Sequence, residues 1–466
     1  MSILASYIVP HPPLIVPEVG RGGEKQIEAT RAAYVRAAEE IASLDPETIV
    51  VTSPHAVMYR DWFHLSPGKS AAGSFSQFRA PGVRFDVRYD AELVREIERL
   101  AEKEDFPAGT DGERDPALDH GTMVPLYFIE RAYAGRTLPM IVRIGLSGLP
   151  LEDHYRLGQL IRQAVESIGR RTVFVASGDL SHKLRQDGPY GFAPEGPLYD
   201  ARLMDVCSRA AFGELFDFDE AFCDKAAECG HRSFVIMAGA LDGQKVDAEV
   251  WSHEDVTGVG YGIAAFHPGE ADESRRFLSV RQVAAQARLD GLRETCDPWV
   301  RLAWQSVESY VTKRRVLPLP EASALPDALT RTRAGAFVSI HKLGQLRGCI
   351  GTIAPTRSCL AEEIIHNAAS ACARDPRFEP IRPDELPLLE ISVDVLGEAE
   401  DISSPAELDV KRYGVIVSRG VRRGLLLPDL DGVDTVEEQI DIARQKAGIA
   451  PGERFTLQRF EVVRHT

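Results

Sequence analysis

Short apolar runs alternate with amphipathic stretches through the first half of the chain, and this alternation restricts its fold more than any other feature. Three runs rich in β-branched residues end in small or turn-forming residues: TIVVTSP (48–54), LPMIVRIGL (138–146) and RTVFVASGDL (171–180). Three other stretches repeat their apolar side chains at helical spacing, at 24–44, 91–104 and 154–169. Continuous apolar strands are buried on both faces, as in parallel sheets. The sequence therefore predicts an α/β fold, with a mixed or parallel sheet flanked by helices.

A change of composition near residue 268 predicts a domain boundary. The segment 258–266 has the pattern of a last strand, and the residues after it are polar and charged. We therefore expect a first domain at 1–268, a linker at 269–284 and a second domain at 285–466. The second part has a helical pattern near 297–314, then strand patterns near 335–342, 345–353, 389–397 and 414–420, and a closing helix near 435–448. This order predicts an α+β domain with its own core.

Composition and charge restrict the surroundings in which the protein works. The chain has 466 residues, 44% hydrophobic and 27% charged, and no apolar run long enough to cross a bilayer. Its start lacks the basic segment and cleavage site of a secretory signal. A formal net charge of -16 makes nucleic acid an unlikely partner. The seven cysteines form no CxxC pair, which disfavours disulfides and structural zinc. We expect a cytoplasmic protein that does not bind membranes.

Four histidines lie at the ends of predicted strands or in the loops just beyond them: His11, His55, His120 and His182. Residues distant in sequence converge at the carboxyl ends of strands in such a sheet. Histidine is a frequent ligand of transition metals and also acts as an acid or base near neutral pH. Each histidine taken alone is more often structural, but the four together indicate a site.

The residues also allow a third metal ligand to be suggested. A non-heme Fe(II) site uses two imidazoles and one carboxylate on one face of the ion. His11 and His55 can supply the imidazoles. Glu228 is the candidate carboxylate because it lies beside Cys229, at the start of a predicted helix that runs to Leu241, and a carboxylate is well tolerated there.

Several short motifs occur in an order that resembles a known family. They are His11 with its prolines, Ser-Pro-His at 53–55, Asp-His-Gly at 119–121 followed by Pro125, SGDLSH at 177–182 and GAL at 239–241. Together they resemble the LigB-type class III extradiol ring-cleavage dioxygenases and the related MEMO proteins. The resemblance covers roughly residues 1–268.

This resemblance implies an iron-dependent oxidoreductase. In such a protein His11, His55 and Glu228 would hold a non-heme Fe(II), and the enzyme would open the ring of a catechol- or aminophenol-type aromatic with dioxygen. His182 matches the family's catalytic acid/base histidine, and His120 a histidine that steadies a substrate oxygen. Assemblies are frequent among LigB-type enzymes, so a homodimer is compatible with this interpretation.

Two assignments remain open at this stage. Asp179 either orients the loop that carries His182 or simply caps a turn. In MEMO-like relatives the third metal position is a cysteine, and here Glu228 and Cys229 are neighbours, so either could face the metal. Cys229 would give a softer site suited to zinc or copper. The alternative function is then a MEMO-like metal- or peptide-binding protein without dioxygenase turnover.

The second domain resembles another family. The strings QLRGCIGTIAP (345–355), ARDPRF (373–378) and LEISVDVL (389–396) resemble the AMMECR-type domain, over about 285–462. The resemblance implies a fold but no settled activity. MEMO-like and AMMECR-type proteins occur in gene neighbourhoods with a radical-SAM protein, which suggests such a protein as a partner by association.

Two residues of the second domain are further candidates. Arg347 could anchor an anion, and Cys349 could act as a nucleophile or redox thiol if it is exposed. The alternative is that Arg347 pairs with an acidic neighbour while Cys349 packs inward.

Overall fold

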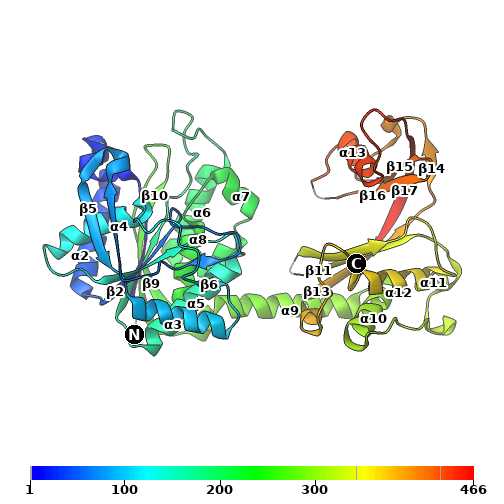
Figure 1. Ribbon diagram of the computed structural model, residues 1–466, viewed down its shortest axis with the longest axis horizontal. Helices are drawn as coiled ribbons and strands as arrows, with labels where there is room; N and C mark the ends of the chain where they lie inside the picture. The colour runs from blue at the N-terminus through cyan, green and yellow to red at the C-terminus, as the bar shows by residue number, and fades with distance from the viewer. Residues whose placement is uncertain (1–2, 343, 431) are drawn as a thin grey trace. The chain divides into compact units, whose positions relative to one another are not determined.

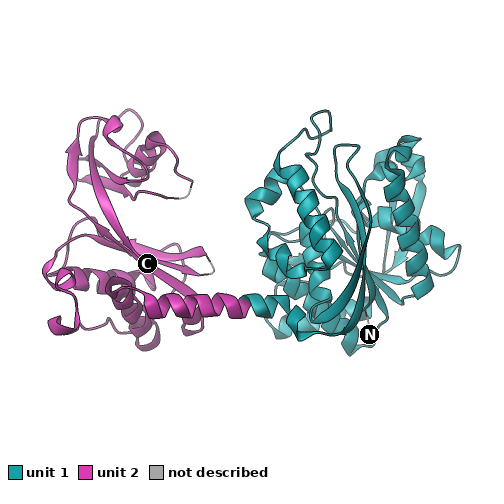
Figure 2. Ribbon diagram, turned by 180° about the vertical axis from the view of Figure 1, so that it is seen from behind, with its two compact units in different colours: residues 1–281 teal, residues 282–466 magenta. Residues whose placement is uncertain are grey.

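The computed structural model describes residues 3–342, 344–430 and 432–466, and the chain divides into two compact units. Unit 1 extends to Arg281 and unit 2 begins at Gln282 (Figure 2). The predicted linker at 269–284 contains the end of strand β10 (Tyr261–Ala271), the short helix η5 (Glu273–Arg275) and the first turns of helix α9 (Phe277–Thr295). Among the described residues, no helix is long and apolar enough to span a membrane.

Unit 1 is built on a six-stranded mixed sheet. Its order is β7 (Met140–Gly145), β2 (Thr48–Ser53), β8 (Thr172–Ser177), β1 (Ile3–Val9), β10 and β9 (Gln244–Glu254). The strands β7, β2, β8 and β1 run parallel, and β10 and β9 are antiparallel additions at one edge. The sequence therefore predicted three of the four parallel strands correctly.

Helices cover both faces of this sheet (Figure 1). One face packs against α2 (Glu28–Leu44) and α4 (His120–Tyr133). The other packs against α3 (Ala91–Lys103), α5 (Leu151–Ser167), α6 (Glu195–Arg209) and α8 (His231–Ala240). Alternate strand residues enter the two cores: Ile49 and Val51 face α2 and α4, while Val50 faces the opposite layer. This double cover explains the continuous apolar strand sequences.

The parallel strands determine where the functional loops lie. His11 follows β1, His55 follows β2, and Asp179 and His182 follow β8. Because parallel strands end at the same edge of a sheet, these loops meet there. His120 is the first residue of α4. The hairpin of β4 (Ser70–Phe75) and β5 (Ala80–Arg88) lies outside the main sheet.

A close contact between α5 and α8 provides a stability test. A β-carbon at Gly158 would lie 2.0 Å from the Ile236 carbonyl oxygen and 2.7 Å from the Ala240 nitrogen. We expect Gly158→Ala to lower the unfolding free energy of unit 1 by about 2 kcal/mol, because the two helices must separate. Denaturant unfolding would measure this loss. The control is Gly82→Ala on β5, where the added methyl group meets no atom within 4 Å, and an equal loss in both variants would contradict the packing argument.

Unit 2 contains a curled antiparallel sheet. Its order is β12 (Gln345–Gly351), β11 (Ala336–Lys342), β13 (Leu389–Leu396), β17 (Thr456–His465), β15 (Tyr413–Arg419) and β16 (Arg422–Leu426), and β14 (Glu400–Ile402) pairs with β17. Helices α10 (Pro298–Lys313) and α12 (Leu360–Ala371) pack against β11 and β13. Helix α13 (Val436–Lys446) packs against β15 and β16.

The sequence predicted α10, β11, β12, β13, β15 and α13 close to their observed positions. The prediction that α13 closes the chain is wrong. The last element is β17, which pairs with both β13 and β15 and so joins the two parts of the sheet.

Candidate metal centre

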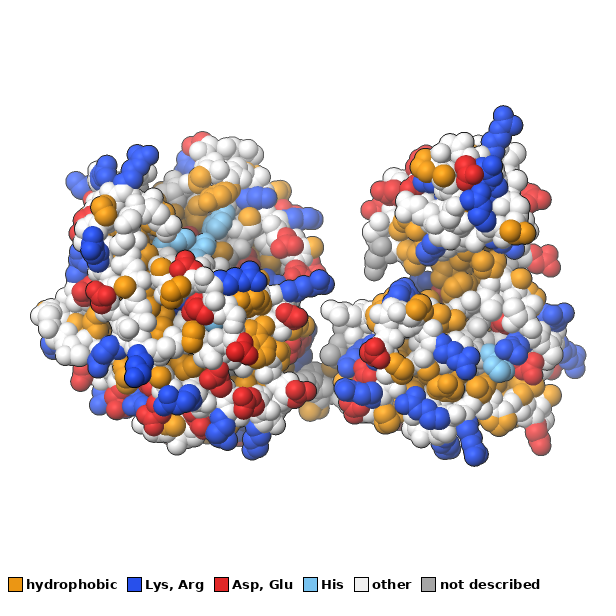
Figure 3. Space-filling model, in the orientation of Figure 1, with side chains coloured by type: hydrophobic (Ala, Val, Ile, Leu, Met, Phe, Trp, Pro, Cys, Tyr) orange, Lys and Arg blue, Asp and Glu red, His pale blue; other side chains and the backbone are white. Residues whose placement is uncertain are grey.

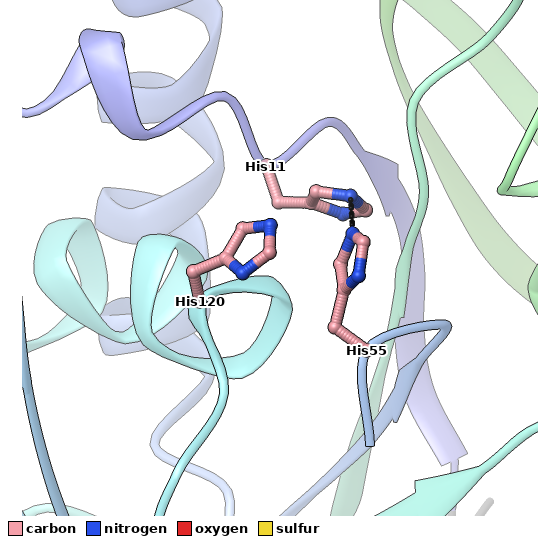
Figure 4. A group of neighbouring side chains, drawn as sticks. All are labelled: His11, His55 and His120. Carbon is pink, nitrogen blue, oxygen red and sulfur yellow. Dashed lines mark hydrogen bonds between the residues drawn. The ribbon is translucent and has the colours of Figure 1, made fainter. Parts of the chain in front are cut away.

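Two histidines from different strand ends face one another in unit 1. The Nε2 atoms of His11 and His55 are 3.0 Å apart (Figure 4). The Sγ atom of Cys229, just before α8, lies 3.6 Å from the same Nε2 atom of His11. Two ligands of one tetrahedral ion are about 3.4 Å apart when each metal–ligand bond is about 2.1 Å. Both distances therefore fit donors that share an ion.

His11 belongs to two groups of potential ligands. Within each group all ligand atoms lie within 4.8 Å of one another: one consists of His11, His55 and His120, and the other of His11, Asp179 and Cys229. The ring centres of His55 and His120 are 4.0 Å apart, and both side chains point toward His11 in Figure 4. The sequence prediction that these histidines converge agrees with this geometry.

Ser177 determines which nitrogen of His11 can bind an ion. The Ser177 hydroxyl donates to the Gly121 carbonyl oxygen at 2.6 Å and lies 3.0 Å from Nδ1 of His11. Since its one proton is committed to Gly121, the hydroxyl must accept from Nδ1–H of His11. The Nε2 lone pair of His11 then faces His55 and Cys229, as a metal ligand requires.

Burial keeps the imidazoles neutral. Burial, together with the neighbouring His55, lowers the pKa of His11 to about 3 and that of His120 to about 3. Burial also lowers the pKa of His55. Neutral rings retain the lone pair that binds a metal. The donor set thus fits a divalent transition-metal ion.

Glu228 points elsewhere. Its carboxylate accepts the backbone N–H of His231 at 2.6 Å, at the first turn of α8. Burial raises the pKa of Glu228 to about 7. Among the described residues, Glu228 is in neither of the two groups of potential ligands, whereas Cys229 belongs to the group with His11 and Asp179. The two candidates for the third ligand therefore differ in position, although they are adjacent in sequence.

Asp179 lies between the metal-facing histidine and His182. Its Oδ1 accepts the backbone N–H of His11 at 2.7 Å, and its Oδ2 lies 4.0 Å from His11 Nε2 and 3.9 Å from His182 Nε2. Burial raises the pKa of Asp179 to about 6 and lowers that of His182. The ring of Tyr190 stacks on His182, with ring centres 5.1 Å apart. Asp179 thus fixes the start of the loop that carries His182 and also approaches the ligands.

A cavity of 860 Å³ opens beside His55 and His120. The hairpin β4–β5 contributes Gln77 and Arg84, and β7 contributes Arg143. Figure 3 shows histidine side chains in a hollow on this face of unit 1. Pockets of a few hundred to about 1,000 Å³ accommodate small organic ligands, so a single aromatic ring fits beside the histidines.

Comparisons with known proteins agree with this geometry. The family model described as the catalytic LigB subunit of aromatic ring-opening dioxygenase matches residues 5–264. The chain belongs to this family. Residues 300–465 match the AMMECR1 model, so a LigB domain is followed by an AMMECR1 domain.

Similar proteins match all or part of this chain. Protein CA_C1420 from Clostridium acetobutylicum is 40% identical over 476 residues, covering 100% of this chain and 99% of its own length. A protein from Thermotoga maritima is 49% identical over 171 residues, 35% of this chain and 97% of its own length. The crystal structure of the uncharacterized protein PH0010 from Pyrococcus horikoshii has 31% identity and a TM-score of 0.33, covering 36% of this chain and 88% of its own.

Arg143 in the LigB domain was missed at the sequence level. Its fully buried guanidinium donates to Ser66 Oγ at 2.6 Å and to the Ala117 carbonyl at 2.6 Å, and lies 3.8 Å from Asp119. Asp119 caps α4 and accepts from Ser53, directly before the loop of His55. The sequence did contain a sign of this role: Arg143 is the one charged residue inside the apolar run 138–146, and a buried arginine must find polar partners.

The two candidates in the AMMECR1 domain have different surroundings. Arg347 forms a two-pronged ion pair with Glu385, at 3.0 Å for each contact. Cys349 is partly exposed, and burial raises the pKa of its thiol. Arg347 is thus engaged by an acidic neighbour, whereas Cys349 remains accessible.

Proposed function

We propose that the LigB domain is a metal-dependent oxidoreductase that opens a catechol- or aminophenol-type aromatic ring with dioxygen. The observation that carries the proposal is the 3.0 Å approach of His11 and His55 at the carboxyl ends of parallel strands, beside a cavity of ligand size. Membership of the LigB family supports the reaction class.

We assign Fe(II) as the metal and His11, His55 and Cys229 as its ligands; His11 is common to the two groups of potential ligands, whereas His55 and Cys229 each come from a different group. A bound Fe(II) ion would supply the one-electron chemistry that dioxygen activation requires and that protein side chains lack. The chain's own contribution is to present neutral Nε2 atoms, with that of His11 fixed by Ser177. His11 is buried, whereas His55 is exposed and His120 partly exposed, so the site opens to the cavity through these two rings.

Other residues would act on the substrate. His182, neutral at pH 7 because burial lowers its pKa, can accept a hydroxyl proton at its imidazole nitrogen. His120 lies at the cavity wall and can hydrogen-bond a substrate oxygen. Phe78 contacts His120 edge-on, with ring centres 5.4 Å apart, and Tyr190 stacks on His182. These contacts would hold the rings of His120 and His182 in place.

The position of Cys229 favours a second candidate function. A thiolate with two imidazoles also suits copper or zinc, and a site loaded with either ion would bind a ligand without ring cleavage. Anaerobic reconstitution with Fe(II), followed by oxygen uptake with catechol and 2-aminophenol, separates the two. Uptake with stoichiometric ring-cleaved product supports the dioxygenase, whereas fully iron-loaded protein that consumes no oxygen with either compound would count against it.

Single substitutions test the third ligand. We expect Cys229→Ser to weaken metal affinity at least about tenfold, because a ligand is lost, and to abolish any sulfur-to-metal absorption band. Glu228→Gln should retain affinity, since its amide oxygen can still accept the His231 N–H. Metal titration of both variants measures this difference. Loss of metal in Glu228→Gln with normal binding in Cys229→Ser would reverse the assignment.

A further inference from the structure

Unit 2 contains a cleft that the proposed chemistry of unit 1 does not use. It has a volume of 1030 Å³, and Figure 3 shows it as a hollow with apolar side chains inside the right-hand unit. The strands β11, β12 and β13 form one wall. The strand β16, the end of α13, residues 427–430 and Val433 contribute to the other.

The strand wall exposes a polar face to the cleft. In β11, Val338 and Ile340 pack against α10 and α12, so the alternate residues Ser339 and His341 face the cleft. The opposite wall carries apolar side chains, Leu425 and Leu427 among them, together with the cations Arg423 and Lys446. A ligand in this cleft would therefore meet apolar and cationic groups on one side and hydrogen-bonding groups on the other.

Cys349 lies on the polar face. Of the four cysteines of unit 2, all within the described residues, only Cys349 is partly exposed. The Ser339 hydroxyl donates to its Sγ at 3.3 Å. The backbone N–H of Cys349 is held by Asp375 at 2.9 Å, and Arg377 donates to its carbonyl oxygen at 3.3 Å. The thiol is therefore fixed in position.

The acidic side chains of the cleft are all paired, but two of its described cations have no acidic partner. Each acidic side chain in the lining has a cationic partner: Glu390 pairs with Arg288, Asp394 with Arg464 and Asp429 with Lys411. Across the described residues, Lys446 and Arg423 have no carboxylate within 4.0 Å, and Arg423 contacts only the Gln458 amide oxygen among side chains. The cleft thus has two cations that no acidic side chain of the described chain compensates.

Lys446 lies near the thiol. Partial burial lowers the pKa of Lys446, and Cys349 and Arg377 are the groups that act electrostatically on its amine. Lys446 and Arg423 are both exposed at the cleft, and a cation without a carboxylate partner beside low-dielectric walls attracts an anion.

We propose that this cleft binds a small anionic molecule with an apolar body, whose carboxylate or phosphate meets Lys446 and Arg423 beside the Cys349 thiol. The apolar body packs on Leu425 and Leu427. The site is separate from the metal centre, and the proposal does not rest on the function of unit 1.

Two thiol reagents of similar size, one anionic and one neutral, test the charge of the cleft. Full-length protein is alkylated with iodoacetate or iodoacetamide, and modification of Cys349 is followed by peptide mass spectrometry. For Cys349 the alkylation rate with iodoacetate is divided by the rate with iodoacetamide, and this ratio is divided by the same ratio for N-acetylcysteine. The resulting value should be about three to ten. Lys446→Gln combined with Arg423→Gln should bring it close to one.

A matched control and a protection experiment complete the test. Lys313→Gln, at the exposed end of α10 and outside the cleft lining, should leave the ratio unchanged. Phenyl phosphate should protect Cys349 at lower concentration than inorganic phosphate or phenol does, and octanoate distinguishes a carboxylate preference from a phosphate preference. A wild-type ratio at or below one, an unchanged ratio in the double variant, or no protection by any of these probes would overturn the proposal.

Discussion

Replacing His182 with Gln is expected to lower kcat for ring cleavage by about 10²- to 10⁴-fold while leaving metal content unchanged. His182 Nε2 lies 3.9 Å from Asp179 Oδ2 and is in neither group of potential ligands among the described residues. Burial lowers its pKa, so the ring can accept a substrate proton at neutral pH. Glutamine preserves polarity but has no basic nitrogen.

The measurement is steady-state oxygen uptake together with metal analysis of the same sample. The matched control is His267→Gln. His267 lies on β10 and pairs with Glu40 on α2, away from the site, so this change should leave kcat unaltered. Normal turnover in His182→Gln would remove the proposed proton acceptor. Loss of metal from that variant would instead make His182 a ligand.

The strand-end histidines show how much of the site the sequence contained. The apolar runs of β2, β7 and β8 required a doubly covered parallel sheet, and parallel strands bring the loops of His11, His55 and His182 to one edge. The convergence of these loops follows from this topology. The 3.0 Å approach of His11 and His55 depends in addition on the conformation of both side chains.

The third ligand depended on finer geometry. Glu228 and Cys229 are adjacent, and a half-turn of backbone before α8 directs one side chain to the His231 N–H and the other to His11. Sequence spacing does not encode that rotation. Ser177 is the first residue of the SGDLSH motif. Its role in fixing the His11 tautomer depends on the position of the Gly121 carbonyl, which comes from a different element.

Two of the strands that were missed, β9 and β17, share a physical cause. The strand β9 reads QKVDAEVWSHE and lies at the sheet edge, where most of its side chains contact water. The strand β17 is central in unit 2 but pairs with strands that leave much of it partly exposed. Neither strand has the continuous apolar pattern of a doubly covered strand, so hydrophobicity alone did not reveal them.

Arg347→Met is expected to destabilise unit 2 by about 3 kcal/mol at pH 7, because it leaves the buried Glu385 carboxylate without its main partner. The Glu385 side chain is only 6% exposed and accepts from both Arg347 and Lys342, each at 3.0 Å. Burial alone would raise the pKa of Glu385, but the hydrogen bonds from Arg347, the Arg382 backbone and Lys342 hold it at about 2.

The sign of the pH dependence follows from this lowered pKa. A folded-state pKa of about 2, below the ordinary value of 4.5, means that ionised Glu385 stabilises the fold above about pH 4.5 and that this contribution is lost as the pH falls toward 2. Denaturant unfolding of wild type and Arg347→Met should therefore differ most at neutral pH and converge in acid. A surface control, Arg331→Met, removes an exposed pair with Asp327 and should change nothing measurable.

The double variant Arg347→Met/Glu385→Leu separates the ion pair from simple packing. If the cost of Arg347→Met arises from an uncompensated buried charge, replacing Glu385 with an apolar side chain should recover most of the lost stability, since neither charge then remains in the interior. If the cost arises from lost contacts of the arginine stem, the double variant should be less stable than the single one. Recovery would establish that Arg347 serves the fold through Glu385, which leaves Lys446 and Arg423 as the cations of the proposed anion-binding cleft.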